Sequence, residues 1–245
     1  MLILAVSDMH GEAAWLAGAP ERHAPDLLLC AGDWGDPGQV AEEQYRALAA
    51  RVRVLSVYGN HDDRELLARL RNADGTPVLL GQGEARAVGG LVVAGISGIW
   101  AKTKLGARLT AQWEAARRRN PALAFEEWAA GRVLPPYVTD EEVAALAAGL
   151  AGRGVDILVM HACPVGLADA APSGRPGGQR CFRQAVEVVR PRLALCGHLH
   201  RFQRADLPDG RAVLNCGDGA QGEGWLIRSE GATWEAWPLA GANGA

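Results

Sequence analysis

The segment MLILAVSDMHG, residues 1–11, shows the pattern that decides the fold. It is a short run of aliphatic residues that ends in Asp8 and His10, whose side chains can bind metals. The run is too short for a core helix and nearly continuous in apolar residues, so it predicts a strand that is buried on both faces. The segment has neither a charged start nor a cleavage site, so it is not typical of a secretion signal.

The same pattern recurs along the chain. Apolar runs that end in polar residues occupy 26–33, 52–60, 91–98, 156–161, 193–198 and 212–218. Helical spacing of apolar residues falls between some of these predicted strands, over 39–51 and 63–71. Asp36-Pro37 offers an N-cap followed by proline at the first helical position, so we assign Asp36 to a helix cap. Alternating strands and helices predict an α/β protein with its strands inside.

Residues 101–150 interrupt this alternation. Helices are expected there over 109–119 and 139–150, and the second begins with a capping box formed by Thr139 and Glu142. We expect a single domain over residues 1–240, in which residues 101–150 form a helical insertion that acts as a cap. Within it, residues 102–119 carry six basic residues against one acid. This run is either a phosphate-facing patch or a solvated helix face.

Composition limits the classes of function. The 245 residues are 49% hydrophobic with a net charge of -3, which is typical of a soluble globular protein and gives no overall attraction to nucleic acid. The five cysteines form no C-x-x-C pair and lie mostly in apolar runs, which indicates a reducing compartment. No apolar stretch approaches the ~20 residues that span a bilayer. We therefore expect a cytoplasmic protein with no membrane partner.

The histidines point to metal binding. Of the six in the chain, only His23 lies outside the motifs that close the predicted strands. In α/β sheets, ligands gather beyond the carboxyl ends of the strands. Mixed imidazole and carboxylate ligands suit Mn²⁺, Fe or Zn²⁺ better than Mg²⁺ or Ca²⁺. Seven candidate ligands are too many for one ion, so two ions that share a carboxylate fit best. The seven candidates are Asp8, His10, Asp33, Asn60, His161, His198 and His200.

The order of the motifs resembles that of the calcineurin-like metallophosphoesterase superfamily. The motifs are D-x-H from residue 8, G-D-x-x-D from 32, G-N-H-D from 59, the lone His161, and G-H-x-H from 197, so they cover most of the chain. The resemblance implies a layered α/β/β/α sandwich of two mixed sheets flanked by helices. It also implies two divalent ions, with Mn²⁺ expected and Fe or Zn²⁺ as alternatives.

The resemblance assigns a role to each motif residue. One ion would be held by Asp8, His10 and His200, the other by Asn60, His161 and His198, and Asp33 would bridge them. In such a site a metal-bridging hydroxide attacks phosphorus in line. The leaving oxygen then needs a proton, for which His61 is the expected general acid. We expect Asp62 to orient the His61 imidazole and to raise its pKa. The alternative for His161 is a buried histidine that only ends a strand.

Two departures from superfamily patterns bear on the substrate. Phosphoprotein phosphatases of the superfamily carry arginine and glutamate where this chain has Pro37 and Asp62, so a phosphoprotein substrate is not expected. The run HACPVGLAD, residues 161–169, is similar to the H-x-P-P-x-G-x-x-D run of small, bacterial-type phosphodiesterase-like members, with Cys163 in place of one proline. We therefore favour a phosphodiesterase that acts on nucleotide-like or other small phosphodiesters.

Other functions stay open at this point. A phosphomonoesterase or a nuclease of the same superfamily is the alternative, although a processive nuclease should carry a longer basic track than residues 102–119. A non-catalytic metal-binding scaffold is disfavoured because the ligand set is complete. Trp100 either stacks on a base or packs in the core. Further candidate phosphate-facing residues are Arg175, Arg180 and Arg183.

Overall fold

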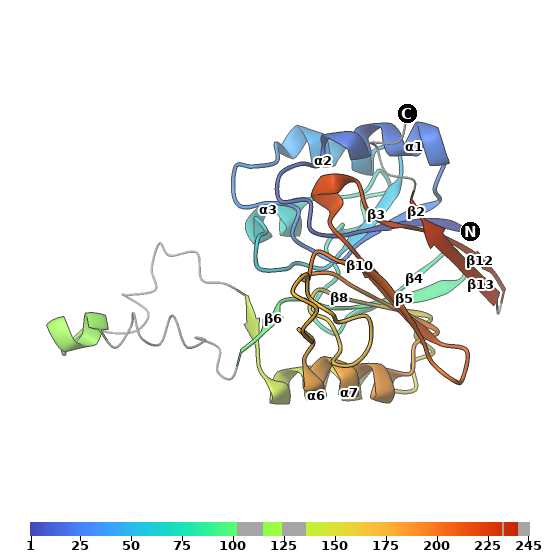
Figure 1. Ribbon diagram of the computed structural model, residues 1–245. Coiled ribbons are helices and arrows are strands. Elements are labelled where there is room, and N and C mark those ends of the chain that lie inside the picture. Colours follow the sequence, from blue (N-terminus) through green and yellow to red (C-terminus); the bar gives the residue numbers. More distant parts are fainter. Residues whose placement is uncertain (102–114, 124–135, 232, 240–245) are drawn as a thin grey trace.

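The structure is a computed structural model that describes residues 1–101, 115–123, 136–231 and 233–239. Two mixed β-sheets face each other, and helices cover the outer face of each (Figure 1). The first sheet has the order β13-β12-β1-β2-β3, and the second β10-β11-β9-β8-β5-β4. The predicted α/β/β/α sandwich is therefore confirmed.

Every buried apolar run of the sequence forms a strand. The first sheet consists of β1 (Leu2–Val6), β2 (Leu27–Cys30), β3 (Arg53–Ser56), β12 (Trp225–Glu230) and β13 (Thr233–Pro238). The second consists of β4 (Ala85–Val88), β5 (Leu91–Ile96), β8 (Ile157–Met160), β9 (Leu193–Cys196), β10 (Phe202–Asp206) and β11 (Ala212–Cys216). Two short strands, β6 (Ile99–Trp100) and β7 (Tyr137–Val138), pair outside both sheets. The central strands are buried on both faces because each sheet is covered by helices on one face and by the other sheet on the opposite face.

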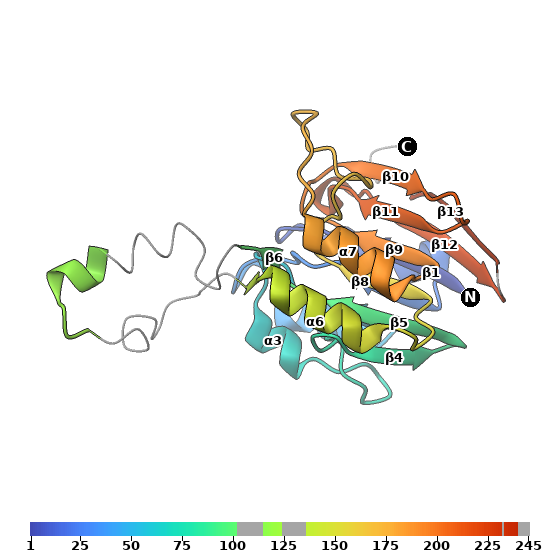
Figure 2. The same cartoon turned by 90° about the horizontal axis from the view of Figure 1, so that it is seen from below.

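Three apolar cores separate the four layers. The cluster between the sheets joins side chains of both, including Leu29 and Val159. On the outer face of the first sheet lie α1 (Ala19–His23), α2 (Glu42–Ala49) and α3 (Arg64–Arg69), with η1 (Ala14–Gly18) packed against α2. On the outer face of the second sheet α6 (Asp140–Leu150) and α7 (Arg180–Val189) lie side by side (Figure 2). A last short helix, η2 (Gly219–Gln221), follows β11.

Two expectations need correction. The helix expected from Asp36 begins only at Glu42, with Ala41 as its N-cap, because Gly38 takes a left-handed φ of 86° and interrupts the helical course after Pro37. Asp36 is therefore not a helix cap.

The second correction concerns residues 139–150, which were assigned to the cap. The predicted capping box of Thr139 and Glu142 is present, but α6 packs its residues Val143, Ala147 and Leu150 into the outer core. The helix is thus part of the sandwich. The rest of the predicted cap consists mainly of residues 102–114 and 124–135, which lie outside the described residues. Most of the helix expected over 109–119 also lies outside them. None of the helices described is both long and apolar enough to cross a bilayer.

Candidate metal centre

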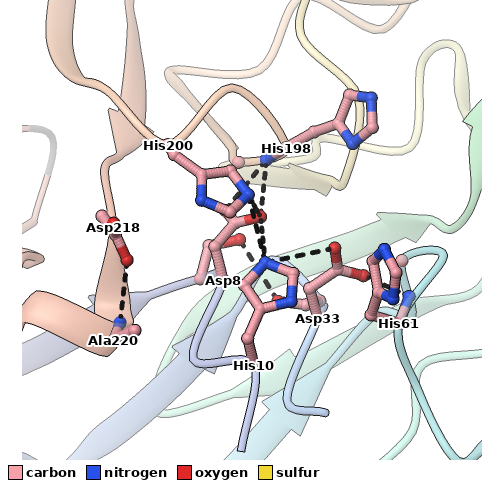
Figure 3. Close-up of polar contacts among 12 residues, drawn as sticks. Asp8, His10, Asp33, His61, His198, His200, Asp218 and Ala220 are labelled. Carbon is pink, nitrogen blue, oxygen red and sulfur yellow. Dashed lines mark hydrogen bonds and ion pairs between the residues drawn. The ribbon is translucent and has the colours of Figure 1, made fainter. Parts of the chain in front are cut away.

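The predicted ligands come together at the carboxyl ends of five strands, and Asn60 follows β3, which is parallel to β2. Asp8 and Asp33 follow the parallel strands β1 and β2, and His161 and His198 follow the parallel strands β8 and β9. The Asp8 carboxylate helps to join the ends of the two sheets, because it accepts the His198 backbone N–H at 2.9 and 3.1 Å. The two sheets therefore meet at a single cluster of side chains (Figure 3).

The backbone at this cluster is strained. Positive φ angles are uncommon for residues other than glycine, and each costs of order 1–3 kcal/mol. They occur at five of the seven predicted ligands: Asp8 at 58°, His10 at 46°, Asp33 at 59°, His198 at 69° and His200 at 49°. Such strain persists only where the surrounding structure enforces it. Its concentration here indicates that the strand ends are shaped for a site and not for stability.

Two motif glycines permit the close approach of the ligands. A Cβ atom on Gly59 would overlap the Asp33 carboxylate and the His161 ring. A Cβ atom on Gly197 would overlap the Asp8 carboxylate and the Ser7 hydroxyl. The G-N-H-D and G-H-x-H motifs therefore need glycine for space.

Asp8, His10 and His200 form the first group of ligands. The Nε2 atoms of His10 and His200 lie 3.1 Å apart, and the rings stack with centroids at 4.7 Å. The Asp8 Oδ1 atom lies 3.5 Å from His200 Nε2 and 3.9 Å from His10 Nε2. The three donor atoms thus face a common point, as the resemblance implied for one ion (Figure 3).

Asn60, His161 and His198 lie around a second point. The His161 Nδ1–H donates to the Ala31 carbonyl at 2.8 Å, which directs its Nε2 atom into the cluster. That Nε2 atom lies 3.3 Å from the Asn60 Oδ1 atom, and the His161 and His198 ring centroids are 5.0 Å apart. The backbone contact of His161 is the kind that fixes the tautomer of a metal-binding histidine.

Asp33 lies between the two groups. Its Oδ2 atom is 3.9 Å from His10 Nε2 of the first group and 3.4 Å from His161 Nε2 of the second. Its Oδ1 atom accepts the His61 backbone N–H at 2.7 Å, which fixes the carboxylate. This is the position that a carboxylate shared by two ions would take.

The electrostatics of the cluster suit cations. Burial, and then the charge of His161, lowers the pKa of His198 to about 4, so its ring is neutral at pH 7 and able to bind an ion. Burial raises the pKa of Asp8. Burial also acts to raise the pKa of Asp33. The charge of His161 and the hydrogen bond from the His61 backbone N–H outweigh this effect, so the pKa of Asp33 is lowered. Asp33 is thus an anion in a buried place, where a cation would neutralise it. Imidazole and carboxylate donors within 4.8 Å of one another fit first-row divalent ions.

The structure contradicts the role predicted for Asp62. Its buried carboxylate accepts three backbone N–H groups, those of Asp33 at 2.8 Å, Trp34 at 2.9 Å and Gly59 at 2.7 Å. Burial, and then the charge of Asp33, raises the pKa of Asp62 to about 7. Asp62 therefore ties together the loops that carry the ligands. It does not orient His61.

The carboxylate beside His61 belongs to Asp36. Its Oδ1 atom lies 3.2 Å from His61 Nδ1, and both side chains are about half exposed. Sequence reasoning missed this residue because its Asp-Pro context was assigned to a cap. The available signal was its place as the last residue of the G-D-x-x-D motif.

The structure also places other residues that the sequence suggested as contacts to substrate. Trp100 packs against the outer core and donates its Nε1–H to Asp140 at 2.7 Å, so the core alternative holds. Arg183 pairs with Glu187 on the surface of α7. Of the six basic residues in the run 102–119, Lys102, Lys104 and Arg108 lie outside the described residues, and Arg117, Arg118 and Arg119 are exposed.

The fold and the site together define a metal-dependent phosphoesterase. The chain belongs to the calcineurin-like phosphoesterase family, which it matches over residues 1–202, and the predicted resemblance is thereby confirmed. A search of curated proteins finds no significant match.

Solved structures share the fold at low sequence identity. The protein TT1561 of Thermus thermophilus is 15% identical, with 96% of this chain and 97% of that chain covered and a TM-score of 0.62. A dimetal phosphatase from Danio rerio is 14% identical, with 97% and 95% covered and a TM-score of 0.59.

Proposed function

We propose that the chain is a two-metal phosphodiesterase that hydrolyses nucleotide-like or other small phosphodiesters, with Mn²⁺ as the metal. One observation carries the proposal: the Asp33 carboxylate lies between two groups of ligands, each with a place for one ion. The ligand set is complete, which argues against a non-catalytic scaffold. The five cysteines are free and buried, which supports the expected cytoplasmic location.

The roles of the residues follow from their positions. When bound, the two ions would lower the pKa of a water molecule and neutralise the phosphoryl oxygens. Asp8, His10 and His200 would hold one ion, Asn60, His161 and His198 the other, and Asp33 both. His61 lies beside this cluster, with its ring centroid 5.1 Å from that of His10.

His61 is suited to protonate the leaving oxygen. Its Nδ1 atom faces Asp36 at 3.2 Å, so the Nε2–H remains to donate to substrate. The carboxylate fixes the ring orientation, as acid-orienting carboxylates do. Asp36 therefore acts through His61 as a positioning residue.

The preference for a diester rests on the 161–169 run and on the charge near His61. Asp36 is half exposed there. Its carboxylate would repel the second negative charge of a phosphomonoester more than the single charge of a diester.

The test compares bis-p-nitrophenyl phosphate with p-nitrophenyl phosphate in the presence of Mn²⁺, with metal-stripped protein as the blank. We expect Mn²⁺-dependent turnover with a higher kcat/KM for the diester. Asp33→Ala should abolish it, whereas His23→Ala, which removes a histidine of α1, should not. A higher kcat/KM for the monoester would replace the proposal with a phosphomonoesterase. Failure of the protein to bind Mn²⁺ would favour the alternative of a non-catalytic scaffold.

A further inference from the structure

The rim of the metal centre differs in charge between its two ends. His61 and His200 lie on either side of His10 (Figure 3). At the His61 end lies a carboxylate, that of Asp36. At the other end Arg201 follows His200 directly and is exposed. An anionic group of a substrate would therefore be repelled at the first end and attracted at the second.

Arg201 differs from most arginines around it. Residues 180–211 contain seven arginines, and five of them pair with carboxylates: Arg183, Arg190, Arg192, Arg204 and Arg211. Within the described part of the chain, Arg201 forms no ion pair; its guanidinium donates from Nη1 to the Ala171 carbonyl at 3.1 Å. The charge of Arg201 is thus not neutralised by any carboxylate among the described residues.

The loop that Arg201 contacts is well ordered by hydrogen bonds. We call residues 169–178, between β8 and α7, the rim loop. The Gly174 N–H donates to the Ala171 carbonyl at 2.7 Å, and the Ala171 N–H donates to the Arg175 carbonyl at 2.8 Å, which closes a tight turn. At its base the Gly177 and Gly178 N–H groups donate to Asp169. The loop can therefore hold a side chain in one place.

Two contacts attach the rim loop to the segment that carries His200. The Gln203 side chain accepts the Ala170 N–H at 3.1 Å and donates to the Ala170 carbonyl at 2.7 Å. Gly177 lies against Leu199, the residue between the two ligands of the G-H-x-H motif, so closely that a Cβ atom would clash. Arg201 is thus fixed relative to the metal ligands on one side and to the rim loop on the other.

We propose that Arg201, held by the rim loop, binds a second phosphate group of the substrate, so that the enzyme favours phosphodiesters that carry a terminal phosphate. The inference rests on the proposed phosphodiesterase function and names its substrate class. The Nε and Nη2 donors of Arg201 remain for the ligand because only Nη1 contacts Ala171. A guanidinium offers two parallel N–H groups to a phosphate, which a lone ammonium cannot.

The test uses two dinucleotides that differ only in a 5′-phosphate. Both have a methylene group in place of the bridging leaving oxygen, so that the internucleotide bond is not cleaved. Their dissociation constants are measured by calorimetry on Mn²⁺-loaded wild-type protein, Arg201→Gln, Arg201→Lys and Arg204→Gln. Arg204 lies three residues further along, pairs with Asp206 and serves as the matched control. Hydrolysis of bis-p-nitrophenyl phosphate is recorded for each protein.

We expect the wild-type protein to bind the 5′-phosphorylated dinucleotide about tenfold more tightly than its partner. This ratio should fall to near one in Arg201→Gln, be partly kept in Arg201→Lys and be unchanged in Arg204→Gln. A ratio of one in the wild-type protein, or an equal ratio in Arg201→Gln, overturns the inference. If Arg201 only fastens the rim loop, both dinucleotides weaken together and the ratio stays. Loss of the proposed function would show separately, as absent hydrolysis of bis-p-nitrophenyl phosphate by the wild-type protein.

Discussion

Replacing Asp36 by asparagine tests whether Asp36 orients His61, the proposed general acid. The Asp36 carboxylate lies 3.2 Å from His61 Nδ1, and the side chains are 50% and 45% exposed. A charge-assisted contact of this exposure is worth about 1.4 kcal/mol after solvent screening. Each 1.4 kcal/mol is about a tenfold change in rate, so kcat should fall about tenfold in Asp36→Asn. His61→Ala removes the proposed acid itself and should lower kcat on the order of 10²–10⁴-fold.

The assay compares two leaving groups. An alkoxide leaving group needs a proton, so both variants should lose most activity on a dinucleotide. The p-nitrophenolate of bis-p-nitrophenyl phosphate leaves readily without one, so the loss on that substrate should be small. Asp63→Asn is the control, because this neighbouring carboxylate caps α3 and accepts the Leu66 N–H. Equal losses on the two substrates would refute the assignment of His61 as acid, and an unchanged kcat in Asp36→Asn would refute its orienting role.

Three further predictions concern the metal ligands and their supports. Asp33→Ala should leave at most one Mn²⁺ per chain by elemental analysis, and retention of two would exclude a bridge. Gly59→Ala should lower the Tm by about 2–12 °C, because the added Cβ overlaps Asp33 and His161, whereas Gly149→Ala, with open space around it, should not lower it. Mn²⁺ should bind more weakly at pH 6 than at pH 8. Burial acts to lower the pKa of His161, but the charges of Asp33 and Asp8 outweigh it and raise the pKa, and the proton must leave before the Nε2 atom binds an ion. Equal calorimetric affinities at the two pH values would contradict this.

Much of the fold could be predicted from the sequence because buried parallel strands have a simple signature. A strand covered on both faces must be apolar throughout, so its end is visible where the first polar side chain appears. At Asp33 and His161 that side chain also carries chemistry, and Asp8 follows the first polar residue, Ser7, directly, so the same boundary predicts both the strand and the site. The glycines beside the ligands add to this signal, since only glycine leaves the space seen at positions 59 and 197.

The errors arose where loops, not strands, place a side chain. Asp62 follows His61 directly, but successive residues of a tight loop point in different directions, and Asp62 turns inward to three backbone N–H groups. Asp36 is 25 residues from His61 and still reaches its ring, because Gly35 and His61 are joined by a backbone hydrogen bond of 2.9 Å. The helix α6 was misassigned because its apolar face does not reveal which surface it covers.

The measurement that tests the two-metal centre most directly is a crystal structure of the Mn²⁺-soaked protein with anomalous diffraction recorded at the manganese edge. The account predicts two anomalous peaks about 3.5–4 Å apart, with the Asp33 carboxylate between them. Asp8, His10 and His200 should surround one peak, and Asn60, His161 and His198 the other. A single peak in Mn²⁺-saturated crystals, or two peaks that do not share Asp33, would contradict it.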